Sequence, residues 1–382
     1  MDPLTALTLD DLRDRSSQKW RRYPPDVLPL FVAEMDVPLA EAVVRALTDA
    51  IGRGDTGYPW GTATYAEALA AFAHERWGWD LDTGATSLVP DVMTGAAEVL
   101  QLLTYPGDVV IVNPPVYPPF YGFIEHAGRR VSEAPLGPDH RLDLDELDGA
   151  MARAVGGGRR AAYLLCSPQN PTGTVHTAEE LAAVAEMADR HGVRVVADEI
   201  HAPLVLDPAT FVPYLTVPGG GAGIALHSAS KGWNLAGVKA ALAVAGEDAV
   251  RDLARMHEVV WHGASHLGVV AHAAAYREGG AWLDALRSSL ATNVDLLQDL
   301  LAEQLPEVRY APGAGTYLAW LDCRALELGD DPAQVFLARG RVALVPGPEF
   351  GTGGAGFARL NLATPPEVLT EAVRRMAAAV GR

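Results

Sequence analysis

Short apolar runs alternate with amphipathic stretches of helical period between residue 60 and about residue 270. The apolar runs predict buried strands at residues 87–90, 108–115, 161–166, 193–199 and 223–230. Between them, the spacing predicts helices over residues 63–77, 95–105, the residues after Tyr117, and 178–192. Strands that alternate with helices of this length indicate an α/β fold with a mostly parallel sheet covered on both faces.

The two ends of the chain follow a different pattern. Helices are predicted over residues 8–15 and 39–51, and a long amphipathic helix over residues 281–305. Strands of the antiparallel type follow at 308–322, 342–347 and 358–363, before a terminal helix from Pro365. Because 382 residues exceed what one hydrophobic core usually supports, we expect two domains. The pattern predicts a large domain at residues 50–275 and a smaller α+β domain made of residues 1–49 and 276–382.

Three polar residues stand at the ends of predicted buried strands. They are Asn170, Asp198 and Lys231. The carboxyl ends of parallel strands meet at one edge of a sheet, where open α/β sheets bind ligands. Alone, each residue has an ordinary interpretation as a turn residue, a helix cap or a surface lysine. Together they predict a site for pyridoxal 5'-phosphate (PLP). Asp198 would pair with the pyridine nitrogen, Asn170 would bond the phenolic oxygen, and Lys231 would bind the cofactor covalently.

Further polar groups near Lys231 predict where the phosphate of PLP binds. Ser228 and Ser230 precede the lysine, and Lys239 follows it in a turn that contains glycine. Two hydroxyl groups and an ammonium group can hold a dianionic phosphate.

Composition narrows the class of protein. The formal net charge of −18 argues against nucleic acid and anionic membranes as partners, because both attract basic surfaces. Every apolar stretch is interrupted before it reaches membrane-spanning length, and the acidic N-terminus lacks the pattern of a signal peptide. We therefore expect a soluble cytoplasmic protein. Cys166 and Cys323 lie in apolar runs and are expected to be free, buried thiols. Four histidines between residues 257 and 272 lack a carboxylate that would complete a metal site, so no metal is expected.

The motifs resemble those of the fold type I PLP enzymes of the aminotransferase class I/II superfamily. The resemblance covers nearly the whole chain, through KWRRYPPDVLPLFVAEMD, VPDVMTG, NPPVYPPF, SPQNPTGTV, VADEIHAPLV, SKGWNLAGVK, GTYLAWLD and FARLNLA. More narrowly, the chain is similar to the MalY/PatB-type cystathionine β-lyases. The resemblance implies a PLP-dependent transferase (aspartate aminotransferase-like) fold and a homodimer with shared active sites.

The resemblance also implies roles for further residues. Val92 and Met93 match the turn whose backbone N–H groups meet the phosphate at a helix N-terminus. Tyr117 matches the aromatic residue that stacks on the pyridine ring, and His201 stands where transaminases usually carry a tyrosine near the cofactor oxygen. Tyr58 matches the tyrosine that reaches the phosphate of the neighbouring subunit, and Arg359 matches the arginine that binds the substrate α-carboxylate. The superfamily often has glycine at Asp91, so we expect this carboxylate to point away or to cap the helix.

Three functions are compatible with these residues. The first is a β-lyase that cleaves L-cystathionine or another cysteine S-conjugate to a thiol, pyruvate and ammonia. The second is an aminotransferase that acts on an amino acid and a 2-oxo acid. The third is a binding or regulatory protein that retains PLP without turnover. The resemblance around Tyr117, His201 and Trp233 favours the lyase, with Trp233 expected to shape the pocket for the substrate side chain.

Overall fold

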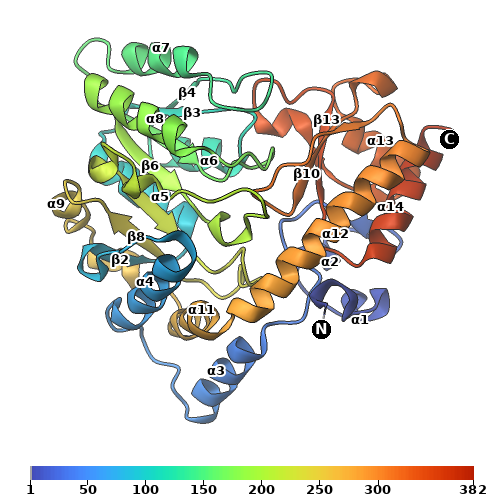
Figure 1. Ribbon diagram of the computed structural model, residues 1–382, viewed down its shortest axis with the longest axis horizontal. Helices are drawn as coiled ribbons and strands as arrows, with labels where there is room; N and C mark the ends of the chain where they lie inside the picture. Colours follow the sequence, from blue (N-terminus) through green and yellow to red (C-terminus); the bar gives the residue numbers. More distant parts are fainter. Residues whose placement is uncertain (1) are drawn as a thin grey trace.

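The computed structural model describes residues 2–382, and its largest element is a seven-stranded sheet (Figure 1). The strand order is β2-β8-β7-β6-β5-β3-β4, and β8 alone among them runs antiparallel to its neighbours. The strands are β2 (Thr86–Val89), β3 (Val109–Val112), β4 (Arg130–Glu133), β5 (Ala161–Cys166), β6 (Arg194–Asp198), β7 (Ile224–His227) and β8 (Ala241–Ala245). The predicted mostly parallel sheet is confirmed.

Helices cover both faces of this sheet, because successive strand residues point to opposite sides. On one face, Val110, Leu164 and Val196 are buried in a core that includes α5 (Val92–Leu103) and α6 (Pro119–His126). On the other face, Ile111 and Tyr163 are buried in a core with α7 (Leu144–Ala154) and α8 (Ala178–His191). A third core lies around α11 (His266–Glu278), which packs against both α3 (Glu41–Gly52) and α4 (Ala63–Trp77).

Two smaller sheets lie at the other side of the molecule in Figure 1. The four-stranded sheet is antiparallel and contains β12 (Val345–Pro346), β13 (Phe357–Asn361), β10 (Leu318–Asp322) and β9 (Arg309–Tyr310). In the two-stranded sheet, β1 (Leu28–Pro29) pairs in parallel with β11 (Val342–Ala343), so the N-terminal segment joins the C-terminal part of the chain. The long helix α12 (Gly280–Gln304) runs along this part and packs against α14 (Pro366–Ala379).

The sheets lie within residues 86–245 on one side and within residues 28–29 and 309–361 on the other. This grouping is compatible with the predicted domains, although α3 runs through the expected boundary at residue 49 and packs against α11. The short helices are α1 (Leu9–Arg13), α2 (Gln18–Arg21), α9 (Val250–Leu253) and α10 (Glu258–Trp261), and α13 spans Pro332–Gly340. No helix within residues 2–382 is long and apolar enough to cross a membrane.

Several elements differ from their predicted bounds. Helix α5 begins at Val92 rather than at Gly95, because the Asp91 carboxylate accepts a hydrogen bond from Thr94 N at 2.8 Å and caps the helix one turn earlier. Strand β8 and helix α7 were not predicted. The expectation that Asp91 caps the helix is confirmed.

Candidate active site

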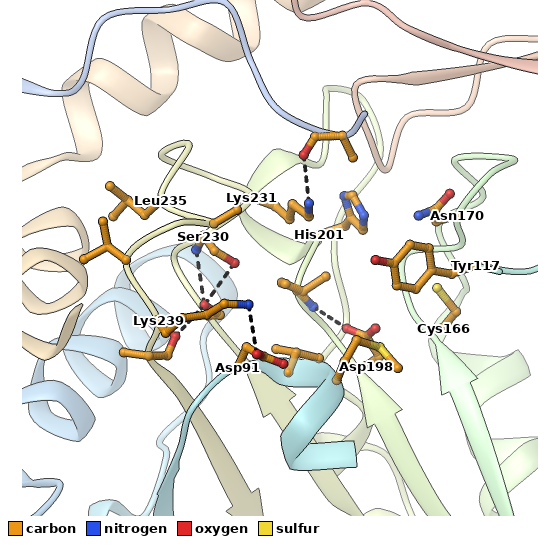
Figure 2. Close-up of a pocket in the computed structure, with 18 of the residues that line it drawn as sticks. Asp91, Tyr117, Cys166, Asn170, Asp198, His201, Ser230, Lys231, Leu235 and Lys239 are labelled. Atoms are coloured by element: carbon orange, nitrogen blue, oxygen red, sulfur yellow. Dashed lines mark hydrogen bonds and ion pairs between the residues drawn. The ribbon is translucent and has the colours of Figure 1, made fainter. Parts of the chain in front are cut away.

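A cavity of about 320 Å³ lies at the carboxyl edge of the seven-stranded sheet (Figure 2). Its walls come from the segments that follow β2, β3, β5, β6 and β7, which is why residues far apart in sequence meet there. The structure brings ten of the predicted site residues to this cavity, namely Val92, Met93, Tyr117, Asn170, Asp198, His201, Ser228, Ser230, Lys231 and Lys239.

Asp198 is a buried carboxylate at the floor of the cavity. It ends β6, and its Oδ1 accepts a hydrogen bond from Ile200 N at 3.1 Å. Burial raises the pKa of Asp198 to about 6, against the opposing effects of that hydrogen bond and of the positive charge of Lys231. No lysine, arginine or histidine of residues 2–382 forms an ion pair with this carboxylate. Asp198 can therefore accept a cationic N–H donor from a bound molecule.

Lys231 lies in the turn after β7, and its side chain points toward the N-terminal loop (Figure 2). Its Nζ donates a hydrogen bond to Ala33 O at 2.8 Å. Burial, and then the positive charge of Arg359, lower the pKa of Lys231 to about 8. At pH 7 about a tenth of this amine is therefore unprotonated, far more than for an ordinary lysine, which favours a role as a nucleophile or a base.

Arg359 lies on β13 and does not line the cavity itself, but it contacts a residue that does. Its Nη1 donates to Asn170 Oδ1 at 3.1 Å and its Nη2 donates to Phe31 O at 2.9 Å. The side chain is buried, and its Nε has no hydrogen-bond partner among residues 2–382. Burial lowers the pKa of Arg359 to about 10. An incompletely bonded, buried guanidinium beside the cavity fits a carboxylate ligand.

His201 lies beside Lys231 in the cavity (Figure 2) and is buried. Its Nδ1 is 3.1 Å from the hydroxyl oxygen of Thr316, and its ring packs edge-on against Tyr317 at 6.1 Å between ring centroids. Burial, followed by the positive charges of Lys231 and Arg359, lowers the pKa of His201 to about 3. The imidazole is therefore neutral at physiological pH and acts as a hydrogen-bonding group rather than as a cationic acid.

The opposite end of the cavity is built to bind an anion. The start of α5, at Val92 and Met93, supplies backbone N–H groups and the positive end of the helix dipole. Ser228 and Ser230 contribute hydroxyl groups, and Lys239 contributes an ammonium group. The Nζ of Lys239 is 2.9 Å from the Oδ2 of Asp91, so an internal carboxylate shares this end of the cavity.

These groups fit PLP. The buried Asp198 has no cationic partner within residues 2–382 and suits a protonated pyridine nitrogen, while the helix start and the two serines suit a phosphate. Tyr117 projects its ring into the cavity (Figure 2), where an aromatic face can stack on a pyridine ring. Burial raises the pKa of the Tyr117 hydroxyl, so it stays protonated.

Besides Arg359, two predicted residues lie outside the cavity. Tyr58 is on the surface with 84% of its area exposed, and its ring stacks on His262. Its role toward a neighbouring subunit stays a prediction. The expectation for Trp233 is wrong: its ring is fully buried against Phe72 and Tyr276, and its Nε1 donates to Gly279 O at 3.0 Å. The turn after Lys231 directs this side chain into the helical core and away from the cavity.

The sequence did not reveal how far the N-terminal segment contributes. Gln18 and Ala33 line the cavity, and Ala33 O also accepts a hydrogen bond from Tyr317 at 2.8 Å. This segment is held by a buried ion pair between Lys19 and Asp36, with 2.7 Å between Nζ and Oδ2. The VAEMD motif marked the segment as part of the resemblance, but its contacts with the cavity needed the tertiary structure.

Both cysteines are free and buried, as predicted, and Cys166 also lines the cavity next to Asn170. Burial raises the pKa of its thiol well above the ordinary value. It therefore contributes a small neutral side chain to the wall. Within residues 2–382, no group of three histidine, cysteine, aspartate or glutamate side chains is arranged to hold a metal ion.

Comparisons with known proteins find similar chains of matching length. The model of the family Aminotransferase class I and II matches residues 25–376. A Mycobacterium leprae protein named "Putative cystathionine beta-lyase" is 54% identical over 396 residues, which cover 99% of this chain and 98% of that protein. A Corynebacterium glutamicum protein named "Cystathionine beta-lyase" is 35% identical and covers 97% of this chain and 98% of its own length.

A solved structure from Corynebacterium diphtheriae, titled as a "putative plp-dependent beta-cystathionase", superposes with a TM-score of 0.93. Its sequence is 34% identical, and the match covers 99% of each chain.

Proposed function

The chain belongs to the aminotransferase class I and II family, and on that premise we propose that it is a PLP-dependent carbon–sulfur β-lyase. It would cleave L-cystathionine or a related cysteine S-conjugate to a thiol, pyruvate and ammonia. The observation that carries the reaction type is the full-length similarity to relatives named cystathionine β-lyase, at 54% and 35% identity. The predicted aspartate aminotransferase-like fold and the predicted cofactor, PLP, are confirmed.

Substrate binding would begin at Arg359. A planar carboxylate can accept two parallel hydrogen bonds from a guanidinium, and the buried Nε has no partner in the described part of the chain. The substrate carboxylate would replace Phe31 O as the acceptor for Nη2. Because Arg359 also contacts Asn170, a carboxylate bound there would be placed next to the cavity that holds Lys231.

Proton removal from Cα of the substrate would be the task of Lys231. Its amine is buried and has a pKa of about 8, so it is close to the optimum for a base that works near neutral pH. When bound, PLP supplies an acceptor for the electron pair that remains at Cα. Asp198 would hold the proton on the pyridine nitrogen, and Asn170 would bond the phenolic oxygen. The thiolate then leaves from Cβ, and 2-aminoacrylate hydrolyses to pyruvate and ammonia.

An aminotransferase is the second candidate, because the family model that matches residues 25–376 is named for that activity. The two reactions share carboxylate binding and removal of the α-proton, and they differ in the fate of the substrate. A lyase breaks the bond between Cβ and sulfur and needs no acceptor. A transaminase keeps that bond and needs a 2-oxo acid to complete its cycle.

One experiment separates the two. Purified protein is incubated with L-cystathionine and with cysteine S-conjugates, with and without a 2-oxo acid, and thiol, pyruvate and ammonia are each measured. We expect equal amounts of the three products without any 2-oxo acid, and none with Lys231→Ala. If product forms only when a 2-oxo acid is supplied, and the amino group is recovered on that acid, the transaminase replaces the lyase.

We also propose that the enzyme is a cytoplasmic homodimer, with the large domain at residues 50–275 and the small domain made of residues 1–49 and 276–382. The exposed rings of Tyr58 and Trp60, which leave 84% and 93% of their areas uncovered, support a partner surface at this loop. Light scattering after gel filtration should give twice the chain mass of 40.5 kDa. Mixing Tyr58→Ala with an inactive Lys231→Ala chain then tests whether the sites are shared.

A further inference from the structure

A carboxylate occupies the end of the cavity that binds the cofactor phosphate. Asp91 lies between β2 and α5, and both oxygens of its carboxylate accept hydrogen bonds. Oδ1 accepts from Thr94 N at 2.8 Å, which places it at the start of α5, and Oδ2 is 2.9 Å from Lys239 Nζ. The side chains of Asp91 and Lys239 both line the cavity. Asp91 thus contacts the helix start and the ammonium group, which are the features that attract an anion from solution.

The carboxyl group of Asp91 is ionised in this position. Although burial acts to raise it, the pKa of Asp91 is below its ordinary value, because the Thr94 N–H and the Lys239 ammonium favour the ionised form. Among the described residues that line the cavity, the cations are Lys231 and Lys239, and Lys231 lies toward the N-terminal loop. The phosphate end therefore has one ammonium group, and a carboxylate already neutralises it.

We propose that Asp91 lowers the affinity of the enzyme for the phosphate of PLP, so that the cofactor is exchanged more readily than the rest of the site would permit. A dianionic phosphate must share Lys239 and the start of α5 with a fixed negative charge. Like charges at such distances repel even where solvent screens them in part. The inference rests on PLP binding by this site and is independent of which reaction follows.

Replacing Asp91 by asparagine tests the effect of its charge while the cap of α5 is kept. It caps helices about as well as aspartate does, so Asp91→Asn keeps the start of α5 and removes only the negative charge. We expect Asp91→Asn to bind PLP about tenfold more tightly, which is the size expected for one partly screened like-charge contact. Binding of pyridoxal, which lacks the phosphate, should not change. Equilibrium dialysis of the cofactor-free protein measures both ligands without any substrate.

Salt adds a second readout. The affinity of Asp91→Asn for PLP should fall more steeply with ionic strength than that of the natural protein, because the unneutralised Lys239 then faces the phosphate. In a Lys239→Gln background, which lacks the ammonium that Asp91 neutralises, Asp91→Asn should still tighten PLP binding, because the carboxylate then faces the phosphate without a counter-charge. Binding is measured by dialysis, so a failed lyase assay leaves this test intact.

Asp143→Asn is the matched control. Asp143 caps α7, away from the cavity, through a 3.0 Å hydrogen bond from Glu146 N, and the substitution should leave PLP binding unchanged. If Asp91→Asn proves unstable, Asp91→Ser offers the same test with another good cap. Unchanged or weaker PLP binding by a folded Asp91 variant would overturn the proposal, since it would mean that the carboxylate orients Lys239 for the phosphate. Equal tightening of PLP and pyridoxal would overturn it as well.

Discussion

Asp198→Asn should stabilise the cofactor-free protein while it removes the proposed partner of the pyridine nitrogen. The carboxylate is buried, has one hydrogen bond from Ile200 N and forms no ion pair within residues 2–382. Its pKa rises from an ordinary value of 3.8 to about 6 because burial disfavours the charged form. An amide of nearly the same shape does not carry that penalty.

The magnitude follows from the shift in pKa. Between pH 3.8 and about 6, the folded state retains a proton that the unfolded state has lost, so stability falls as the pH rises through this window. A shift of about two units corresponds to roughly 3 kcal/mol at pH 8, and to about 0.5 kcal/mol at pH 4. The gain in stability from Asp198→Asn should therefore be large at pH 8 and nearly absent at pH 4.

Thermal unfolding of the cofactor-free proteins at several pH values measures this difference. Any change in packing between Asp and Asn adds the same amount at every pH, so the pH dependence isolates the ionisation. Pyruvate release by the PLP-loaded variant should meanwhile be almost lost. A stability difference that does not vary with pH would show that the burial of Asp198 carries no such cost, and the reasoning would fail.

Three further predictions concern other residues. Lys231→Ala should abolish pyruvate release and leave the circular dichroism spectrum unchanged; measurable turnover would reassign the base. Thr316→Val removes the hydroxyl bonded to Nδ1 of His201, so kcat should fall about tenfold with little change in KM. In a His201→Asn background the same substitution should cause no further loss of kcat. Additive losses of kcat would mean that the two residues act independently. Lys19→Met leaves Asp36 buried without its ammonium partner and should lower the free energy of unfolding by about 3–5 kcal/mol, measured by thermal unfolding. The double variant Lys19→Met/Asp36→Leu should recover most of this stability. No recovery would mean that the loss comes from packing.

Asn170, Asp198 and Lys231 could be placed from the sequence because each stands at the end of an apolar run, and strand ends of a parallel sheet share an edge. This is local information. The contacts of Lys231 with Ala33 and of Arg359 with Asn170 join positions 198 and 189 residues apart, and no local pattern encodes them.

The direction of the Trp233 side chain also could not be predicted from local sequence. Its side-chain direction depends on the turn after β7, where Asn234 adopts a positive φ of 59°. The resemblance and its position two residues after Lys231 predicted a ring near the cavity, but the turn directs it into the core. The missed strand β8 likewise depends on tertiary pairing. The early start of α5, by contrast, follows from the local Asp91 cap, which the sequence had indicated.

The hydrogen bond between Phe31 O and Arg359 joins residues 328 positions apart. Because of this separation, the two parts of the site are synthesised at different times. The residues that line the cavity lie between positions 18 and 240, whereas Arg359 is made near the end of the chain. At common translation rates, the last 142 residues take roughly 7–30 s to emerge. During that interval the strands of the large sheet are available to fold around their core, but the proposed carboxylate-binding arginine has not yet been made. On the proposed roles, a nascent chain therefore completes its cofactor-binding residues before it is able to hold an amino acid.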